Sequence, residues 1–283
     1  MLSLISVEFL KIRRRRVTWV SFGIVVAFFA FMIIGLRLII RGAEGHASEA
    51  FEEIDSALRF AVGFGAIPRL EVQFGLWSVI VLVALLVGSE YGWGTLRLAL
   101  ARGPSRTQFM LGMLVAMMIT VAIGTVAILA LSAIFMVLAD LALGTFDPVY
   151  PDRFLPGLVL DWLRTTGVLM IYVGIAFAAA GLLRSGGAGL GVGIAFVVVE
   201  QIVGQIFSGF GGTLADISQF LPAALVQSVL STNQLGAGTF GEDVGFALLE
   251  AWTAGVVLFV YFMVLVGGTI WVFNRRDITG GGE

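Results

Sequence analysis

The chain alternates long apolar stretches with shorter polar ones. Six apolar stretches meet or approach the length of a membrane-crossing helix: 17–40, 72–89, 109–139, 158–183, 188–207 and 246–273. A helix rises about 1.5 Å per residue and the hydrocarbon core is about 30 Å thick, so roughly 20 apolar residues suffice. The pattern predicts an all-α membrane protein with six transmembrane helices. Charged residues make up 13% of the chain and its mean hydropathy is +1.01, which exclude a soluble domain.

The distribution of charge indicates the orientation, because Lys and Arg near the ends of membrane helices stay on the cytoplasmic side. The side that holds both termini is the more basic: Lys11, Arg13 to Arg16, Arg97, Arg102, Arg106, Arg184, Arg275 and Arg276. The opposite loops, which include 41–71 and 208–245, are rich in acids. We therefore expect cytoplasmic termini. The first apolar run exceeds the roughly 7–15 residues of a signal-peptide core, so we expect it to be retained.

Residues 1–16 precede the first apolar stretch and have a helical pattern of their own. Leu2, Ile5, Phe9 and Ile12 fall on one helical stripe, and the segment ends in four arginines. This pattern predicts a basic amphipathic helix along the cytoplasmic interface. The alternative is a plain positive-inside anchor.

Two of the external segments also have structure in their pattern. In the first, Phe51, Ile54, Leu58 and Ala61 recur at helical spacing. They predict a short external helix, either solvated or covering the mouth of a pathway. In the second, the apolar run around Pro222 is too short to span a membrane, which predicts a re-entrant or external half-helix.

Small residues are concentrated at the start of the fifth stretch. Gly187 and Gly191, and likewise Gly189 and Gly193, are four residues apart. Such spacing lets helix backbones approach closely. The contact is expected inside the monomer, with a second copy of the chain, or in both places.

Composition removes several kinds of chemistry. The chain has no cysteine, one histidine (His46, in the first external loop) and one lysine, Lys11. Thiolate metal sites are thereby excluded, and a catalytic or metal-ligand role of the lone His46 and an intramembrane enzyme are both disfavoured. Lys11 is not part of a Gly-Lys-Ser/Thr loop, so the chain lacks the motif that holds ATP phosphates. We expect no metal or cofactor in this chain and no enzymatic activity of its own.

Glu200 lies near the middle of the fifth stretch, followed by Gln201 and Gln205 on the same general face. A carboxyl group at that depth is costly and normally faces a cavity or a partner. These three residues are candidates for a translocation pathway. The alternative is that Glu200 is a hydrogen-bonded structural group that ties helices together.

The most specific pattern lies between the second and third stretches. Glu90 is followed by Gly94-Thr95-Leu96-Arg97 and then by Pro104-Ser105-Arg106. The residues between predict a short helix with Leu96 and Leu100 on one face, stopped by Gly103-Pro104. This arrangement resembles the cytoplasmic coupling loop of type-2 ABC exporter permeases. The basic first helix, the six spans and a Leu-Pro pair in the long fifth-to-sixth connection are also similar to that family, although Met113 stands where many members have lysine.

The resemblance implies a permease that exports a hydrophobic or amphipathic substrate. It would pair with a second copy or a related permease and with two ATP-binding subunits that hold ATP and Mg. The residues at or near that ATPase contact would be Glu90, Thr95, Leu96, Arg97, Leu100, Arg102 and Arg106. The second and fifth spans would line the route, with Glu200 near it.

We expect such a protein in the plasma (cytoplasmic) membrane of a prokaryotic cell, in contact with lipid and not with nucleic acid. The competing hypothesis is a secondary transporter or channel in which Glu200 carries a proton or coordinates a cation.

Overall fold

The computed structural model describes residues 2–42, 54–55, 58–92, 103–146, 154–210, 212–233 and 248–276. The regular structure of these residues is entirely helical. Six of the helices are long and apolar enough to cross a membrane: Arg16–Gly42, Phe64–Gly92, Arg106–Leu143, Phe154–Leu183, Gly186–Phe207 and Ala251–Arg275. They confirm the six predicted spans and indicate a multi-pass membrane protein.

The first span is made of α2 (Arg16–Ala30), a π-helical turn η1 (Phe31–Gly35) and α3 (Leu36–Gly42). The second combines a 3₁₀ turn η2 (Phe64–Ala66) with α6 (Ile67–Gly92). The remaining spans are α8 (Arg106–Leu143), α9 (Phe154–Leu183), α10 (Gly186–Phe210) and α13 (Ala251–Arg275). The shorter helices are α1 (Leu2–Arg14), α5 (Phe60–Gly63), α11 (Gly212–Ser218) and α12 (Pro222–Leu230).

The second span begins at Phe64, eight residues before its predicted start at 72. The prediction included Arg69 and Glu71 in the first external loop, 41–71. In the structure both are helical residues of α6: Arg69 donates to the carbonyl oxygen of Leu230 at 3.4 Å, and Glu71 is buried. The second span therefore contains these two charged residues near its beginning.

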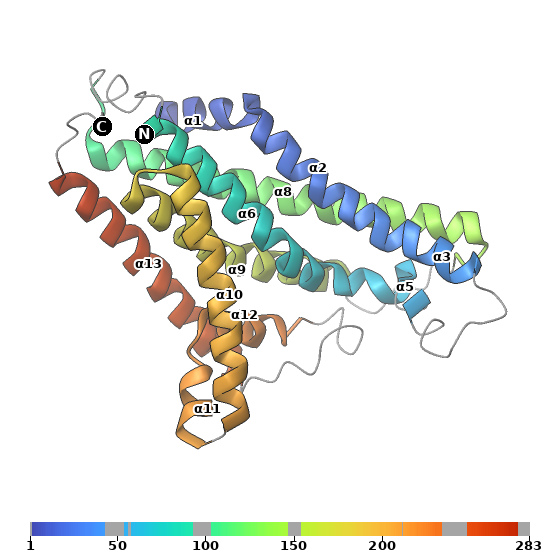
Figure 1. Ribbon diagram of the computed structural model, residues 1–283. Helices are drawn as coiled ribbons and strands as arrows, with labels where there is room; N and C mark the ends of the chain where they lie inside the picture. The colour runs from blue at the N-terminus through green and yellow to red at the C-terminus, as the bar shows by residue number, and fades with distance from the viewer. Residues whose placement is uncertain are drawn as a thin grey trace.

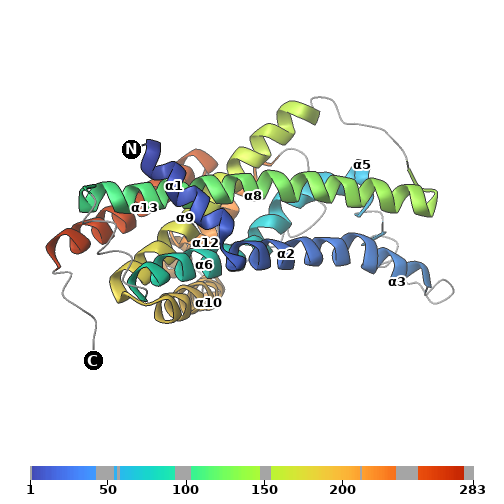
Figure 2. The ribbon, with the colours of Figure 1, turned by 90° about the horizontal axis from the view of Figure 1, so that it is seen from above.

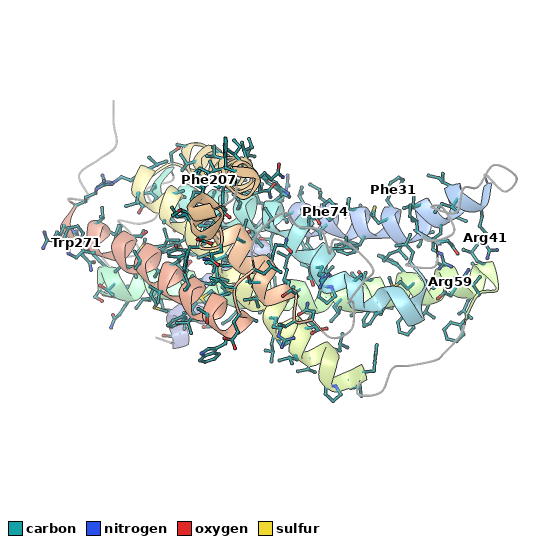
Figure 3. The ribbon with its side chains drawn as sticks, turned by 90° about the horizontal axis from the view of Figure 1, so that it is seen from below. Phe31, Arg41, Arg59, Phe74, Phe207 and Trp271 are labelled. Carbon is teal, nitrogen blue, oxygen red and sulfur yellow. The ribbon has the colours of Figure 1, made fainter. Side chains whose placement is uncertain are left out.

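The helices form two groups that share α8. In one group α6, α9, α10 and α13 pack around a core that includes Ile80, Val83 and Phe177 (Figure 1). In the other, α2, η1 and α3 run alongside α8 for most of its length (Figures 1 and 2). Phe74 of α6 faces α2, and its ring centroid lies 3.9 Å from that of Phe28 (Figure 3).

The predicted first helix is present as α1, which lies across the beginning of α8 (Figure 2). Ile12 is buried, and Leu4 lies against Gly112, where an added Cβ would be 2.2 Å from the Leu4 Cδ2 atom. The Leu4 side chain therefore occupies the space that a side chain at residue 112 would need, and glycine leaves that space free. The start of α1 and the end of α13 lie at the same end of the bundle (Figure 1), as an even number of spans requires.

The glycines of α10 divide into two kinds. A Cβ on Gly189 would lie 2.5 Å from the Cα of Ala180 in α9, and one on Gly193 would lie 2.8 Å from Ile80 in α6. This pair confirms close packing inside the monomer. Gly187 and Gly191 have open space at the same position, so contact with a second copy stays a prediction for that pair.

The first external segment differs from the single helix expected between 51 and 61. Ile54 and Asp55 are helical, Leu58 lies in a turn and Arg59 is extended, so α5 begins only at Phe60. Asp55 and Leu58 are buried. The described part of this segment therefore packs against the bundle rather than lying free in solvent. Phe51 and His46 fall outside the described residues.

Candidate functional site

The predicted ATPase-contact residues begin at the end of α6, where the structure gives Glu90 two basic partners. Its carboxylate lies 2.6 Å from Nη2 of Arg15 and 3.5 Å from Nζ of Lys11, and Arg15 also donates to the hydroxyl of Ser89. Glu90 is only 3% exposed. Its side chain thus fastens α1 to α6 directly before the loop of residues 93–102.

The other end of that loop is fixed as well. Ser105 caps α8 through a reciprocal pair of hydrogen bonds with Gln108, and Arg106 donates to the carbonyl oxygens of Asn274 and Arg276 at 3.2 and 2.8 Å. Arg106 therefore satisfies carbonyl groups at the C-terminus of α13. Glu90 and Arg106 lie at one end of the bundle. Thr95, Leu96, Arg97, Leu100 and Arg102 lie outside the described residues.

Glu200 is buried in α10 and bonded to α12. Its Oε1 accepts a hydrogen bond from the backbone N–H of Ala223, the second residue of α12, and its Oε2 is buried without a partner among the described residues. A carboxylate suits this position because the first N–H groups of a helix lack partners within it. Gln201 and Gln205 are exposed. Contrary to expectation, the structure therefore does not bring the three residues onto one face.

The half-helix predicted around Pro222 is α12, which begins at that proline and forms a bent pair with α11 at 73°. Two arginines hold its other end: Arg164 of α9 donates to the carbonyl oxygen of Thr232 at 2.6 Å, and Arg69 of α6 to that of Leu230. A carboxylate at the N-terminus and guanidinium groups at the C-terminus both complement the helix dipole. Three spans thus clamp α12 by its ends.

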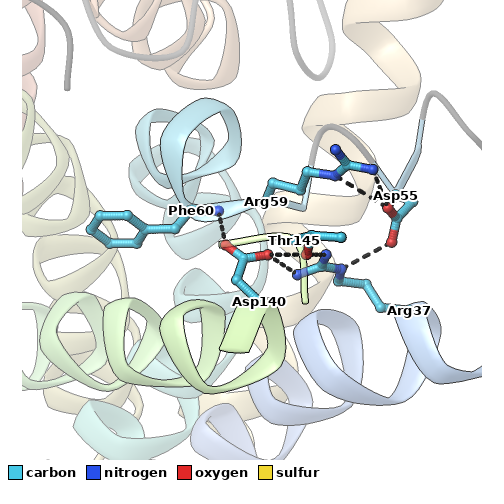
Figure 4. Close-up of polar contacts among 6 residues, drawn as sticks. All are labelled: Arg37, Asp55, Arg59, Phe60, Asp140 and Thr145. Atoms are coloured by element: carbon cyan, nitrogen blue, oxygen red, sulfur yellow. Dashed lines mark hydrogen bonds and ion pairs between the residues drawn. The ribbon is translucent and has the colours of Figure 1, made fainter. Parts of the chain in front are cut away.

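A buried charge cluster at the opposite end of the bundle from Glu90 was missed by the sequence analysis (Figure 4). Arg37 is fully buried and uses all its nitrogens: Nε donates to Asp55 at 3.0 Å, Nη1 to Asp140 at 2.6 Å and Nη2 to the Thr145 hydroxyl at 3.0 Å. Asp140 also accepts from the backbone N–H of Phe60 at 2.9 Å. These contacts join the end of the first span to α5 and to the end of α8.

Two backbone features bring this cluster together. Ser21, Val25, Phe29, Ile33 and Arg37 face inward at intervals of four residues, and a regular α-helix would turn that row by roughly 160° over its length. The π-helical turn η1 rotates less per residue than an α-helix, so it takes up part of this excess and helps to keep Arg37 on the inner side. At the end of α8, Gly144 adopts the left-handed conformation (φ 66°) that brings the Thr145 hydroxyl to Asp140.

The charge of Asp55 responds to this arrangement. Burial alone would raise the pKa of Asp55, but hydrogen bonds and the positive charges of Arg37 and Arg59 more than offset it, so the pKa lies below its ordinary value. Arg59, which precedes α5 in an extended conformation, reaches the same carboxylate at 3.1 Å. With its hydrogen-bonding groups satisfied in this way, the cluster is a structural fastening rather than a binding site.

A cavity of about 470 Å³ lies between α2, α6 and α8. From α6 it is lined by residues on one helical stripe: Glu71, Gly75, Ser78, Val79 and Leu82. α2 contributes Trp19 and Phe22, and α8 contributes Ile123, Gly124 and Thr125 among others. A cavity of this volume is within the usual range of small-molecule sites.

Glu71 is a functional candidate that was not predicted from the sequence. It is 3% exposed, and its Oε1 has no hydrogen-bond partner among the described residues. The signal available was its position, one residue before a predicted span and between the apolar residues Leu70 and Val72. The cavity can hold a mainly apolar molecule, and Glu71 supplies a carboxyl group in its wall.

Comparisons with known proteins bear on the family and not on the activity. No curated protein matches the chain. The model of one family matches residues 50–279, from the first external segment to a few residues past α13. The chain therefore belongs to the family described as "Protein of unknown function (DUF2705)".

Proposed function

We propose that this protein is the membrane-spanning permease subunit of an ABC exporter, which moves hydrophobic or amphipathic molecules while a separate subunit hydrolyses ATP. The observation that carries the proposal is the course of α6. At one end this helix leads directly into the loop that resembles a coupling loop, and its stripe from Glu71 to Leu82 lines the cavity.

A continuous helix transmits displacement along its length. Leu82 and Glu90 are eight residues apart, which is about 12 Å along α6. A movement of the loop that tilts α6 therefore changes the width of the cavity. Glu90 fastens α1 to the same end of α6, so α1 moves with it. α10 follows as well, because a Cβ on Gly88 would lie only 2.1 Å from Gly186.

The position of the cavity suits a substrate that is dissolved in the membrane. Trp19 and Ile123 both line it, and both are more than half exposed at the surface of α2 and α8. The opening therefore faces the side of the bundle that the bilayer would cover, and apolar molecules reach it without crossing water.

The test is purification of the chain from native membranes followed by identification of its partners. We expect an ATP-binding subunit in equal number, and ATP hydrolysis that depends on that subunit. The double variant Leu96→Asp/Arg97→Glu should abolish co-purification, because truncated interface anchors typically cost about 2 kcal/mol or more. Arg14→Glu, at an exposed position of α1 on the same end, is the matched control and should co-purify normally. Unchanged assembly of the double variant would refute the proposal.

The competing hypothesis of a secondary transporter or channel rested on Glu200. One oxygen of that carboxylate is bonded to α12, and Glu200 is not among the residues that line the cavity. No observation favours a secondary transporter or channel over the exporter.

A further inference from the structure

The charged groups of the cavity are placed unequally. Arg13 and Glu71 are the charged residues among those that line it. Arg13 is exposed and adjoins the junction of α1 and α2, whereas Glu71 is buried about two turns into its span. Glu71 forms no ion pair within the described part of the chain, and one of its oxygens has no hydrogen-bond donor.

Such a carboxyl group is costly to bury when no partner compensates it. The neighbouring hydroxyls do not supply one: Thr125 donates to the carbonyl oxygen of Ala122 and accepts from the indole of Trp162, and Ser78 donates to the carbonyl oxygen of Ser21. The fixed groups of the wall thus leave an unmatched acceptor inside an apolar space.

We propose that this cavity binds an amphipathic organic cation, with Glu71 as the counter-ion for its positive group. The apolar walls from α2 and α8 take the hydrophobic body of the ligand. Phe9, Trp19 and Phe22 add aromatic rings, whose faces attract cations. The claim that the bound cation is then transported rests on the proposed function, whereas its binding does not.

Other occupants fit the walls less well. An organic anion would meet the carboxylate of Glu71 inside an apolar space, where like charges repel strongly. A lipid acyl chain would leave that carboxyl group buried and unpaired. A bare metal ion needs several oxygen ligands, and the wall offers a single carboxylate.

The test uses two probes of matched shape and opposite permanent charge, tetraphenylphosphonium and tetraphenylborate. Binding of each to the full chain in nanodiscs of zwitterionic lipid is measured by equilibrium dialysis, with empty nanodiscs subtracted. We expect saturable binding of one tetraphenylphosphonium per chain and none of tetraphenylborate. Glu71→Gln keeps the volume and removes the charge, and should weaken tetraphenylphosphonium binding by about tenfold or more.

Two glycines in opposite walls allow a steric test that leaves Glu71 in place. A Cβ on Gly75 would meet nothing closer than 3.9 Å, and one on Gly124 nothing within 4 Å. Gly75→Leu and Gly124→Leu therefore fill the cavity, and each should abolish binding. Gly23→Leu is the control, because Gly23 also has open space but does not line the cavity. Elution volume and circular dichroism identify any variant that misfolds.

Three results would overturn the inference: equal binding of both probes, unchanged binding to Glu71→Gln, or unchanged binding to both filled variants. A phospholipid that co-purifies with wild type and is lost from Gly124→Leu would assign the cavity to lipid instead. All these measurements use the chain without its partner. A failure here, with an ATP-binding subunit still co-purifying, would leave the proposed function standing.

Discussion

Glu200 of α10 accepts a hydrogen bond from the backbone N–H of Ala223 at the start of α12. This hydrogen bond connects α10 to α12, a short helix that is not part of the six long helices. Together with Arg164, which holds the far end of α12, it explains how a proline-initiated helix of nine residues keeps its place.

Replacing Glu200 should loosen α12 to a degree that depends on the remaining acceptor. Glu200→Ala removes the bond and should lower the free energy of unfolding by about 1–2 kcal/mol, the usual cost of a lost helix cap. Glu200→Gln keeps a carbonyl oxygen and should be milder. Thermal unfolding in detergent measures both, with Glu250→Ala as control because that acid caps α13 without a side-chain bond. Equal stability of all three variants would show that the bond contributes nothing.

The buried cluster predicts strong coupling between Arg37 and Asp140. Arg37→Met leaves the buried carboxylate of Asp140 without a cation and leaves Asp55 with Arg59 alone, so it should destabilise the protein by roughly 3 kcal/mol or more. Adding Asp140→Asn to Arg37→Met removes one of those charges and keeps acceptors for Phe60 and Thr145, so part of the loss should be recovered. A double-mutant cycle of unfolding free energies measures this coupling. Additive effects of the two substitutions would contradict it.

The lowered pKa of Asp55 gives the protein an acid-sensitive contribution to its stability. Because the folded-state pKa lies below the ordinary value of 3.8, the contribution is fully present above that value. It is lost as the pH falls through the folded-state pKa. Asp55→Asn should therefore be less stable than wild type between pH 5 and 7, and the difference should shrink below about pH 4. Unfolding temperatures of wild type and Asp55→Asn measured across that pH range test this. A difference that does not change with pH would argue against the ion pairs of Asp55.

The topology has a direct test because the chain has no native cysteine. Ser6 in α1 and Ser231 after α12 are both exposed. We expect Ser6→Cys to react with an impermeant reagent from the cytoplasmic side and Ser231→Cys from the opposite side, as the arginine distribution requires. Labelling of both from one side would reject six crossings with this orientation.

Hydrophobic pattern was sufficient to predict the six spans, because length and apolarity decide whether a helix crosses a membrane. It failed where charges lie inside helices. Arg69 and Glu71 were placed in a loop. In the structure Arg69 bonds to α12 and Glu71 lines a cavity with α2 and α8, helices that are distant in sequence. Asp140 falls one residue past a predicted span and Arg37 lies within another. Two opposite charges near the ends of two spans on one side were the available signal for that cluster.

Side-chain direction was the other limit. Glu200 was correctly identified as a group that needs a partner, but its partner is a backbone N–H 23 residues away, which helical periodicity does not reveal. Gln201 and Gln205 were grouped with it by proximity in sequence. At 100° per residue, Gln201 and Gln205 share a direction that Glu200 does not, and the exposure of the two glutamines follows from that difference.

The last prediction concerns the fastening of α1 to α6. Arg15 and Glu90 form a close pair at 2.6 Å, with Glu90 buried and Arg15 partly so. Arg15→Glu should repel α1 from the end of α6, and Glu90→Arg should do the same with Lys11 and Arg15. In either single variant protease cleavage between α1 and α2 should become faster. If the protein is the proposed exporter permease, ATP hydrolysis by its complex should also lose its dependence on added substrate. The exchanged pair Arg15→Glu/Glu90→Arg restores opposite charges, so it should recover much of both properties. Recovery of neither would mean that α1 reaches its position through apolar contacts such as Leu4 on Gly112, and that α6 transmits the movement of the loop without it.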